Sequence, residues 1–239
     1  MPREPLLLVP GLMCDATVWQ PLLPALQAGG RDCRVVDHAD ADRLPQMAQQ
    51  LLDTAPPRFA LAGHSMGARV ALEVLRSAPD RVTRVALLDT GYLARAAGAP
   101  GEEEARKRQA LLDVARRDGV RTMAAQWVQG MVHPDRLQDA PLIDAIVDMF
   151  ARKSPDVFER QIRALLQRPD ATGVLRAIRV PTLVLCGRQD SWAPVPQHEA
   201  MHALIPGAVF EVIEDAGHMA PMERPQAVAD ALLRWLQAL

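Results

Sequence analysis

The motif in this sequence that is best suited to catalysis has a serine at its centre. Residues 63–67 read Gly-His-Ser-Met-Gly, and they join an apolar segment to a segment with helical spacing. Between a strand and a helix, this G-x-S-x-G pattern predicts a sharp turn whose glycines make room for a strained middle residue. The turn holds the Ser65 hydroxyl clear of the sheet, at the positive end of the following helix. We therefore predict that Ser65 is a nucleophile rather than a serine that only caps the helix.

Two polar loops later in the chain offer the partners that a nucleophilic serine needs. A serine hydroxyl is a poor nucleophile near neutral pH, so a base must accept its proton and a carboxylate must orient that base. Asp190 follows the apolar segment 182–186, and His218 follows the apolar segment 209–213. The candidate residues therefore occur in the order Ser65, Asp190, His218.

The elements that must position these residues are short apolar segments that alternate with longer segments of helical spacing. Because the apolar segments are continuous and not alternating, we expect strands buried on both faces of a mostly parallel sheet of about six strands, flanked by helices in an α/β fold. The expected strands are residues 6–9, 33–37, 58–62, 84–88, 182–186 and 209–213, and the helical segments between the first four are 17–28, 44–54 and 66–76.

Residues 91–173 interrupt this alternation, because they contain helical segments but no strand-like one. The last helical segment opens with Ser154 and Pro155, a side-chain N-cap followed by a residue suited to the first turn. A helical block inserted between two strands predicts a lid over the carboxyl edge of the sheet. We therefore divide the chain into an α/β core, residues 1–90 and 174–239, and a lid, residues 91–173. The helices expected in the lid are 102–117, 120–129, 141–153 and 155–167.

Together these features resemble the α/β-hydrolase fold family over nearly the whole chain. The turn at Ser65, the G-x-x-D turn at 187–190 and the Ala-Gly-His loop at 216–218 carry the resemblance. It implies that the serine, the aspartate and the histidine of these motifs form a catalytic triad at the carboxyl edge of the sheet. In length and helical lid the chain is similar to small bacterial carboxylesterases, including carrier-protein methyl ester esterases. Relatives often begin with an antiparallel hairpin, which we expect to be missing because only about five residues precede Leu6.

Other residues compete for two of these roles. Some members of the family place the acid where Asp89 follows an apolar segment, but we favour Asp190 because Gly187 frees its turn. His64 is next to Ser65 in the chain and should point away from it. Asp215 is expected to be a solvated loop residue. The remaining histidines follow no suitable strand, and we expect them at the surface or in the lid: His38, His133, His198 and His202.

An oxyanion hole is the third requirement of this chemistry. The resemblance implies that the backbone N–H groups of Met66 and Leu12 donate hydrogen bonds to the developing oxyanion. Most relatives carry His-Gly before the second donor, whereas this chain has Pro10-Gly11. Because the donor is a backbone amide, losing the histidine side chain need not remove the hole. In the same loop, Cys14 is expected to be a small buried hydrophobe rather than a redox-sensitive thiol.

The composition excludes several other classes of function. The 239-residue chain carries 27 basic and 29 acidic side chains, and 4% of its residues are aromatic, so we expect no nucleic-acid partner. No apolar run approaches the ~18 residues that span a bilayer. Cys14, Cys33 and Cys186 are too few and too far apart for a disulfide framework or a tight zinc cluster. We expect a cytoplasmic protein that uses no membrane, metal or cofactor.

A serine at the nucleophile position narrows the reaction. Haloalkane dehalogenases and epoxide hydrolases of this family use an aspartate there, so attack of Ser65 on a carbonyl remains. We expect cleavage of a small-molecule carboxylic ester through an acyl-enzyme, since an alkoxide leaves more readily than an amine. Two alternatives stay open. One is a carbon–carbon bond hydrolase or enol-lactonase with the same triad, and the other is a non-catalytic hydrolase-like protein that binds a ligand.

The composition of the lid bears on the substrate. Its large apolar side chains are suited to line an acyl pocket, although such helical stripes more often dock a lid on its core. Basic residues at 106–108, 116–117 and 121 form either a solvated helix face or a recognition site for an acidic carrier protein or a carboxylated substrate. The pocket candidates are Trp127, Met131, Phe150 and Phe158 from the lid, with Trp19 and Trp192 from loops near the entrance.

Overall fold

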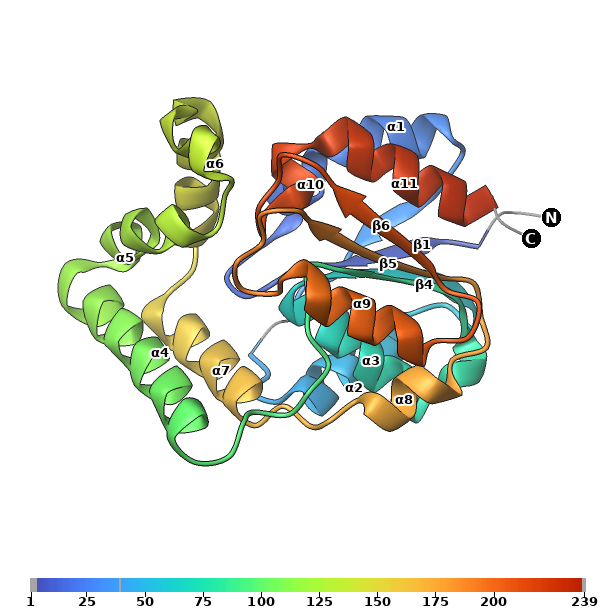
Figure 1. Ribbon diagram of the computed structural model, residues 1–239, viewed down its shortest axis with the longest axis horizontal. Helices are drawn as coiled ribbons and strands as arrows, with labels where there is room; N and C mark the ends of the chain where they lie inside the picture. Colours follow the sequence, from blue (N-terminus) through green and yellow to red (C-terminus); the bar gives the residue numbers. More distant parts are fainter. Residues whose placement is uncertain (1–3, 39, 238–239) are drawn as a thin grey trace.

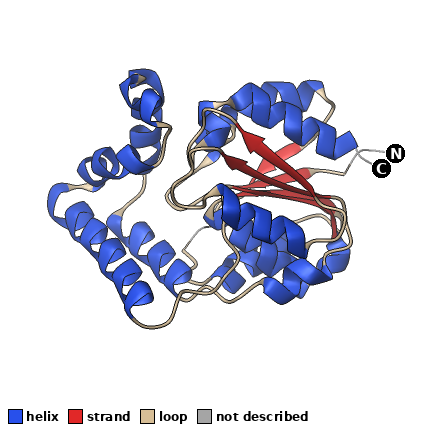
Figure 2. Ribbon diagram, in the orientation of Figure 1, coloured by secondary structure: helices blue, strands red, loops and turns tan. Residues whose placement is uncertain are grey.

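A computed structural model describes residues 4–38 and 40–237, and these form a parallel sheet between two layers of helices (Figures 1 and 2). The six strands lie in the order β2-β1-β3-β4-β5-β6, and every neighbouring pair is parallel. This arrangement confirms the expected mostly parallel sheet, and no antiparallel strand joins it within the described ranges. The strands are β1 (Leu6–Val9), β2 (Cys33–Val35), β3 (Phe59–His64), β4 (Val82–Leu88), β5 (Thr182–Gly187) and β6 (Val209–Ile213).

The central strands are buried on both faces, which explains their continuous apolar sequences. Every residue of β1, β3 and β5 is buried, whereas the edge strands β2 and β6 are partly exposed. In Figure 1, one face of the sheet is covered by α1 (Leu23–Ala28) and α11 (Pro225–Gln237), near the short helix α10 (Ala220–Glu223). The other face is covered by α2 (Leu44–Thr54), α3 (Met66–Ser77), α8 (Thr172–Ala177) and α9 (Val195–Leu204).

The segment 17–28 differs from the helix expected there. Only its last part is α-helical, in α1, and two short 3-10 turns precede it at Ala16–Val18 and Gln20–Leu22. A continuous α-helix would need backbone N–H donors at positions 21 and 24, and both of these residues are proline. The hydrophobic spacing was compatible with a helix, but the two prolines divide the segment into turns.

Four longer helices are inserted between β4 and β5, where no strand was expected. They are α4 (Ala99–Asp118), α5 (Val120–Trp127), α6 (Ala140–Ala151) and α7 (Pro155–Leu166), with 3-10 turns at Val128–Gly130 and Pro134–Gln138. Ser154 caps α7 as expected, because its side chain accepts a hydrogen bond from the N–H of Val157. Figure 1 shows these helices beside the edge of the sheet where the strand arrows end. None of the helices in the described ranges is both long and apolar enough to cross a membrane.

Candidate active site

The turn between β3 and α3 places Ser65 in an unusual backbone conformation. Ser65 has a φ of 55° and a ψ of −118°, a region that costs a non-glycine residue roughly 1–3 kcal/mol. The glycines on either side are needed because the backbone is crowded there. A Cβ on Gly67 would collide with the carbonyl of Val9, and one on Gly63 would collide with the backbone of Ala68. Strand, turn and helix together therefore present the Ser65 hydroxyl above the sheet edge.

Ser65, His218 and Asp190 form one chain of hydrogen bonds, although they come from three distant segments. The Ser65 Oγ lies 2.8 Å from Nε2 of His218, and Nδ1 of the same ring lies 2.8 Å from Oδ2 of Asp190. His218 and Asp190 are only 6% and 2% exposed. When the ring proton is on Nδ1 and is donated to Asp190, Nε2 is free to accept the proton of the serine hydroxyl.

The loop after β5 keeps Asp190 ionised. Burial opposes the charge of Asp190, but the imidazole of His218 and two backbone donors outweigh it, so the pKa of this carboxyl is below its usual value. The two donors are the N–H groups of Trp192 and Ala193, each 2.9 Å from Oδ1. Gly187 lets this loop approach the histidine loop, because a Cβ there would collide with the carbonyl of Gly217.

Asp89 also lies at this edge but does not contact the ring of His218. Its Oδ1 accepts a hydrogen bond from the N–H of Gly187 at 2.9 Å, and its Oδ2 lies 3.8 Å from Nε2 of His64. The side chain is fully buried, and burial followed by the charge of Asp190 raises the pKa of Asp89 well above its usual value. The structure therefore brings Asp190, and not Asp89, to the histidine.

His64 points away from the nucleophile, as its place in the turn suggested. Its Nε2 donates to the backbone carbonyl of His218 at 2.8 Å, and burial lowers the pKa of His64 to about 3. A neutral, buried His64 supports the loop that carries His218. Its ring cannot serve as the base for Ser65, because His218 already occupies the position beside the hydroxyl.

The expectation of exposed positions was wrong for two of the other histidines. His38 is 3% exposed and its Nε2 lies 2.8 Å from the carbonyl of Pro10, in the loop after β1. His198 is fully buried on α9, and its Nε2 accepts the N–H of Thr90 at 2.9 Å. Each buried ring meets a backbone polar group from a distant segment, a pairing that offsets the cost of burying it. His133 and His202 are partly exposed.

Two polar side chains support the site in ways that the sequence did not indicate. The hydroxyl of Thr90 donates to the carbonyl of Ser65 at 2.8 Å, directly behind the nucleophile. Gln161, on the inserted helix α7, accepts the N–H of Met13 at 2.7 Å and so holds the loop after β1. Both contacts join segments far apart in the chain, and no local pattern in the sequence marks them.

Glu223 fixes the loop that carries His218. Its Oε1 accepts hydrogen bonds from the N–H groups of Gly217 at 2.9 Å and Met219 at 3.2 Å, and its Oε2 accepts that of His133 at 2.7 Å. The side chain is 2% exposed, and burial raises its pKa. An acidic residue among apolar ones, five positions after His218, was the signal that could have found it.

Two backbone N–H groups are available beside Ser65. Neither Leu12 N–H nor Met66 N–H donates to an acceptor within the described part of the chain, whereas the next amide of the loop, Met13, is bonded to Gln161. Gly11 permits the close approach of this loop, because a Cβ there would lie 3.1 Å from the Cβ of Ser65. Both amides belong to residues that line the same cavity as Ser65. They are the pair expected to act as oxyanion donors.

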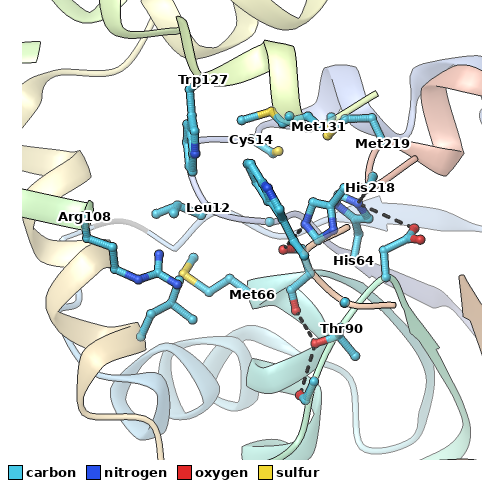
Figure 3. Close-up of a pocket in the computed structure, with 18 of the residues that line it drawn as sticks. Leu12, Cys14, His64, Met66, Thr90, Arg108, Trp127, Met131, His218 and Met219 are labelled. Carbon is cyan, nitrogen blue, oxygen red and sulfur yellow. Dashed lines mark hydrogen bonds and ion pairs between the residues drawn. The ribbon is translucent and has the colours of Figure 1, made fainter. Parts of the chain in front are cut away.

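A cavity of about 490 Å³ opens above Ser65 and His218. Aromatic rings form part of its wall, with Trp127 stacked on Trp192 at a centroid distance of 5.3 Å and Trp192 only 4.9 Å from the ring of His218. Figure 3 shows Trp127 and Met131 on the wall formed by the inserted segment. The pocket candidates that line the cavity are Trp127, Met131, Phe150, Phe158 and Trp192.

Trp19 does not line this cavity, contrary to the expectation from its position in the sequence. It is fully buried, and its ring meets His64 edge-on at a centroid distance of 6.4 Å. Trp19 directly follows the 3-10 turn at Ala16–Val18 and belongs to the hydrophobic core. Cys14 does line the cavity, but burial raises the pKa of its thiol to about 12, which fits the expected apolar role. No cluster suited to a metal ion occurs among the residues that the structure describes.

Comparisons with known proteins agree with this architecture. The model of the alpha/beta hydrolase family matches residues 6–231. A pimeloyl-[acyl-carrier protein] methyl ester esterase of Photobacterium profundum is 30% identical over 238 residues, which cover 95% of this chain and 92% of that protein.

Solved structures give the same result. A thermophilic esterase from Thermogutta terrifontis superimposes with a TM-score of 0.84 at 29% identity, over 98% of this chain and 90% of that one. The enol-lactonase of Burkholderia xenovorans has a TM-score of 0.83 at 24% identity, over 99% and 92% of the two chains, and it shares the fold. The family match covers nearly the entire chain, so the protein is a member of the alpha/beta hydrolase family and has the hydrolase fold of bacterial esterases.

Proposed function

We propose that the protein is a cytoplasmic serine hydrolase that cleaves carboxylic esters through an acyl-enzyme. One observation carries the proposal: the hydroxyl of the strained Ser65 lies 2.8 Å from a histidine whose other nitrogen lies 2.8 Å from the buried carboxylate of Asp190. In this chain of contacts Ser65 is the nucleophile, His218 the general base and then the general acid, and Asp190 the group that orients the ring and stabilises its charged form.

The reaction proceeds in two half-reactions. Nε2 of His218 accepts the hydroxyl proton as Oγ of Ser65 adds to the ester carbonyl, and the N–H groups of Leu12 and Met66 donate to the oxyanion. The imidazolium then gives the proton to the departing alkoxide, which leaves as the alcohol. Water repeats the sequence on the acyl-enzyme, with His218 taking its proton, and releases the carboxylic acid and free Ser65.

The surroundings of Ser65 support an ester with an apolar acyl or alcohol group. The cavity is walled by the aromatic residues of the inserted helices, which we propose act as a lid over residues 1–90 and 174–239. The Photobacterium profundum relative is named a methyl ester esterase, and the Thermogutta terrifontis structure is that of an esterase. A small-molecule ester is therefore the first substrate to test.

A larger candidate substrate is an ester carried on an acidic carrier protein, which the name of the Photobacterium profundum relative supports. It would dock on the exposed basic side chains of α4 and α5. Each of these already has a carboxylate neighbour, as in the pairs Arg106–Glu103, Arg117–Asp118 and Arg121–Asp148. Because exposed pairs are screened by salt, docking predicts that hydrolysis of a carrier-bound ester falls steeply with ionic strength, while that of the free ester does not.

Hydrolysis of p-nitrophenyl esters tests the proposed reaction. We expect the wild type to release p-nitrophenol from short-chain esters, and Ser65→Ala and His218→Ala each to lower kcat by about a thousandfold or more. Ser77→Ala, at the far end of the same helix and outside the cavity, is the matched control and should keep its rate. A fluorophosphonate probe should label the wild type and the control but not Ser65→Ala.

Three results would count against ester hydrolysis at this site. Retained activity in both the Ser65 and the His218 variants would place the chemistry elsewhere. Ring-cleavage dienones or enol-lactones hydrolysed far faster than every simple ester would favour the carbon–carbon bond hydrolase or lactonase. A folded wild type that the fluorophosphonate does not label would favour a protein that only binds its ligand.

A further inference from the structure

Cationic side chains line the same cavity as Ser65 and His218. Arg69 comes from α3, one helical turn after Ser65 and about 6 Å further along the helix axis. Arg108 comes from the inserted helix α4. Figure 3 shows Arg108 across the cavity from His218, on the side of the inserted helices. A single cavity therefore contains the proposed nucleophile and two guanidinium groups.

The positive charge at this end of the cavity exceeds the negative charge. Arg108 and Arg168 share one carboxylate, Glu104, whose Oε1 lies 2.9 Å from Nη2 of Arg108 and 2.7 Å from Nη1 of Arg168. Burial opposes the charge of Glu104, but the two arginines outweigh it and lower its pKa to about 2. Glu104 is therefore fully ionised and can offset only one of the two positive charges that it contacts.

Arg69 has no carboxylate of its own. Its Nη1 donates to the backbone carbonyl of Leu93 at 3.1 Å, and none of the ion pairs among the described residues includes it. Burial, and then the neighbouring Arg168 and Arg108, lower its pKa to about 9, although the charge of Glu104 opposes this lowering. In this respect Arg69 differs from the exposed arginines of α4 and α5, each of which faces a carboxylate.

A ligand carboxylate would supply the missing negative charge. Guanidinium groups bind carboxylates through paired N–H donors, and such charge-assisted hydrogen bonds strengthen where water is partly excluded. The remaining walls of the cavity are largely apolar, with Leu111, Phe150 and Leu165 among the lining residues. This combination suits an aliphatic chain that has an ester at one end and an anionic group at the other.

We infer that Arg69 and Arg108 form a carboxylate-binding subsite, and that the substrate is an ester bearing a second carboxylate, such as a monoester of an aliphatic dicarboxylic acid. This inference rests on the proposed ester hydrolysis, because it names the substrate class of the same site. The subsite orients the substrate so that its ester carbonyl lies at Ser65.

Monomethyl esters of the straight-chain diacids from succinic to suberic acid test the subsite. Each is compared with the dimethyl ester of the same diacid, which has the same chain but no charge. We expect kcat/KM for the monoester to exceed that for the diester by about tenfold to a hundredfold at the best chain length. In Arg69→Gln and Arg108→Gln this ratio should fall close to one, and Arg69→Lys should restore part of it.

The ratio is measured within each variant, so a smaller folded fraction does not change it. Arg234→Gln is the control, because Arg234 is an exposed arginine of α11 that pairs with Glu211 outside the cavity, and it should keep the wild-type ratio. The free diacid should also inhibit the wild type competitively against a neutral ester, and Arg69→Gln should weaken this inhibition at least tenfold.

The outcomes separate the two proposals. Rapid hydrolysis of the diesters with a ratio below two at every chain length would overturn the subsite but leave ester hydrolysis standing. A high ratio that survives both glutamine substitutions would also overturn it, because the selectivity would then arise elsewhere. If neither the monoesters nor any neutral ester is hydrolysed, the proposed function fails and the inference fails with it.

Discussion

The substitution Asp190→Asn tests the proposed role of the acid most sharply, because the surrounding donors dictate how the new side chain must lie. Oδ1 of Asp190 accepts the N–H groups of Trp192 and Ala193, and Oδ2 faces Nδ1 of His218. An asparagine has to keep its carbonyl oxygen against the two backbone donors, so its NH₂ group turns toward the imidazole. Nδ1 must then accept a hydrogen bond, and the ring proton moves to Nε2, beside the hydroxyl of Ser65.

This change of tautomer removes the acceptor for the serine proton. A misplaced ring proton in a serine–histidine–acid site lowers kcat by about 10⁴-fold, which corresponds to about 5.4 kcal/mol of activation free energy. The loss should fall on kcat more than on KM, because Asp190 does not line the cavity that holds the substrate. Folding should be retained, since the asparagine still accepts both backbone N–H groups.

Asp89→Asn is the matched control, because it makes the same chemical change at the neighbouring strand end. Burial and the charge of Asp190 raise the pKa of Asp89 well above its usual value, which favours the neutral form, and the asparagine still accepts the N–H of Gly187. Initial rates on p-nitrophenyl acetate, with active sites counted by fluorophosphonate, should show a change of no more than about threefold. If Asp190→Asn retains over a tenth of kcat, or Asp89→Asn loses as much as Asp190→Asn, the assignment of the acid is wrong.

Three further predictions follow from contacts around the site. Glu223→Gln replaces one acceptor oxygen by an NH₂ group, which then faces a backbone N–H donor. Urea denaturation should therefore show a loss of about 1.5–3 kcal/mol in the free energy of unfolding, and activity should fall because the His218 loop is less well held. Unchanged stability would contradict this role. Gly67→Ala places a Cβ against the carbonyl of Val9, and we expect little folded protein by circular dichroism, whereas a folded and active variant would refute the crowding argument. Burial raises the folded-state pKa of Asp89 above its unfolded value, so its contribution to stability is lost as pH rises through the folded value. Asp89→Asn should therefore gain stability relative to the wild type as pH rises above the ordinary range of a carboxyl group, and a difference that does not change with pH would show that Asp89 does not titrate as argued.

The parts of the fold that depend on local sequence were predictable. Strands β1 and β6 have the expected bounds, and the turn at Ser65 follows from glycines whose missing side chains leave room for backbone contacts. The inserted helices were also expected, because their hydrophobic spacing and the cap at Ser154 are contained within single segments. In each case the forces that fix the conformation act between residues close together in the chain.

Contacts between distant segments were not predictable in the same way. Gln161 reaches the amide of Met13 from the inserted helices, and His198, on the helix after β5, accepts the amide of Thr90, which follows β4. Their partners are backbone groups, which look alike in every sequence. Trp19 was expected in the pocket because it is near the site in the sequence. That position did not reveal that its ring points into the core.

The choice between Asp89 and Asp190 shows how the fold settles a question that the sequence leaves open. Both carboxyls are buried at neighbouring strand ends, and each disfavours the charge of the other, so the fold favours only one ionised group. Asp190 is the ionised one because two backbone N–H groups and the imidazole of His218 surround it. Asp89 has one backbone donor and an oxygen without a hydrogen-bond partner, and its raised pKa favours the protonated form. A second carboxyl at this edge therefore need not compete for the histidine, because the number of donors around each one decides which carries the charge.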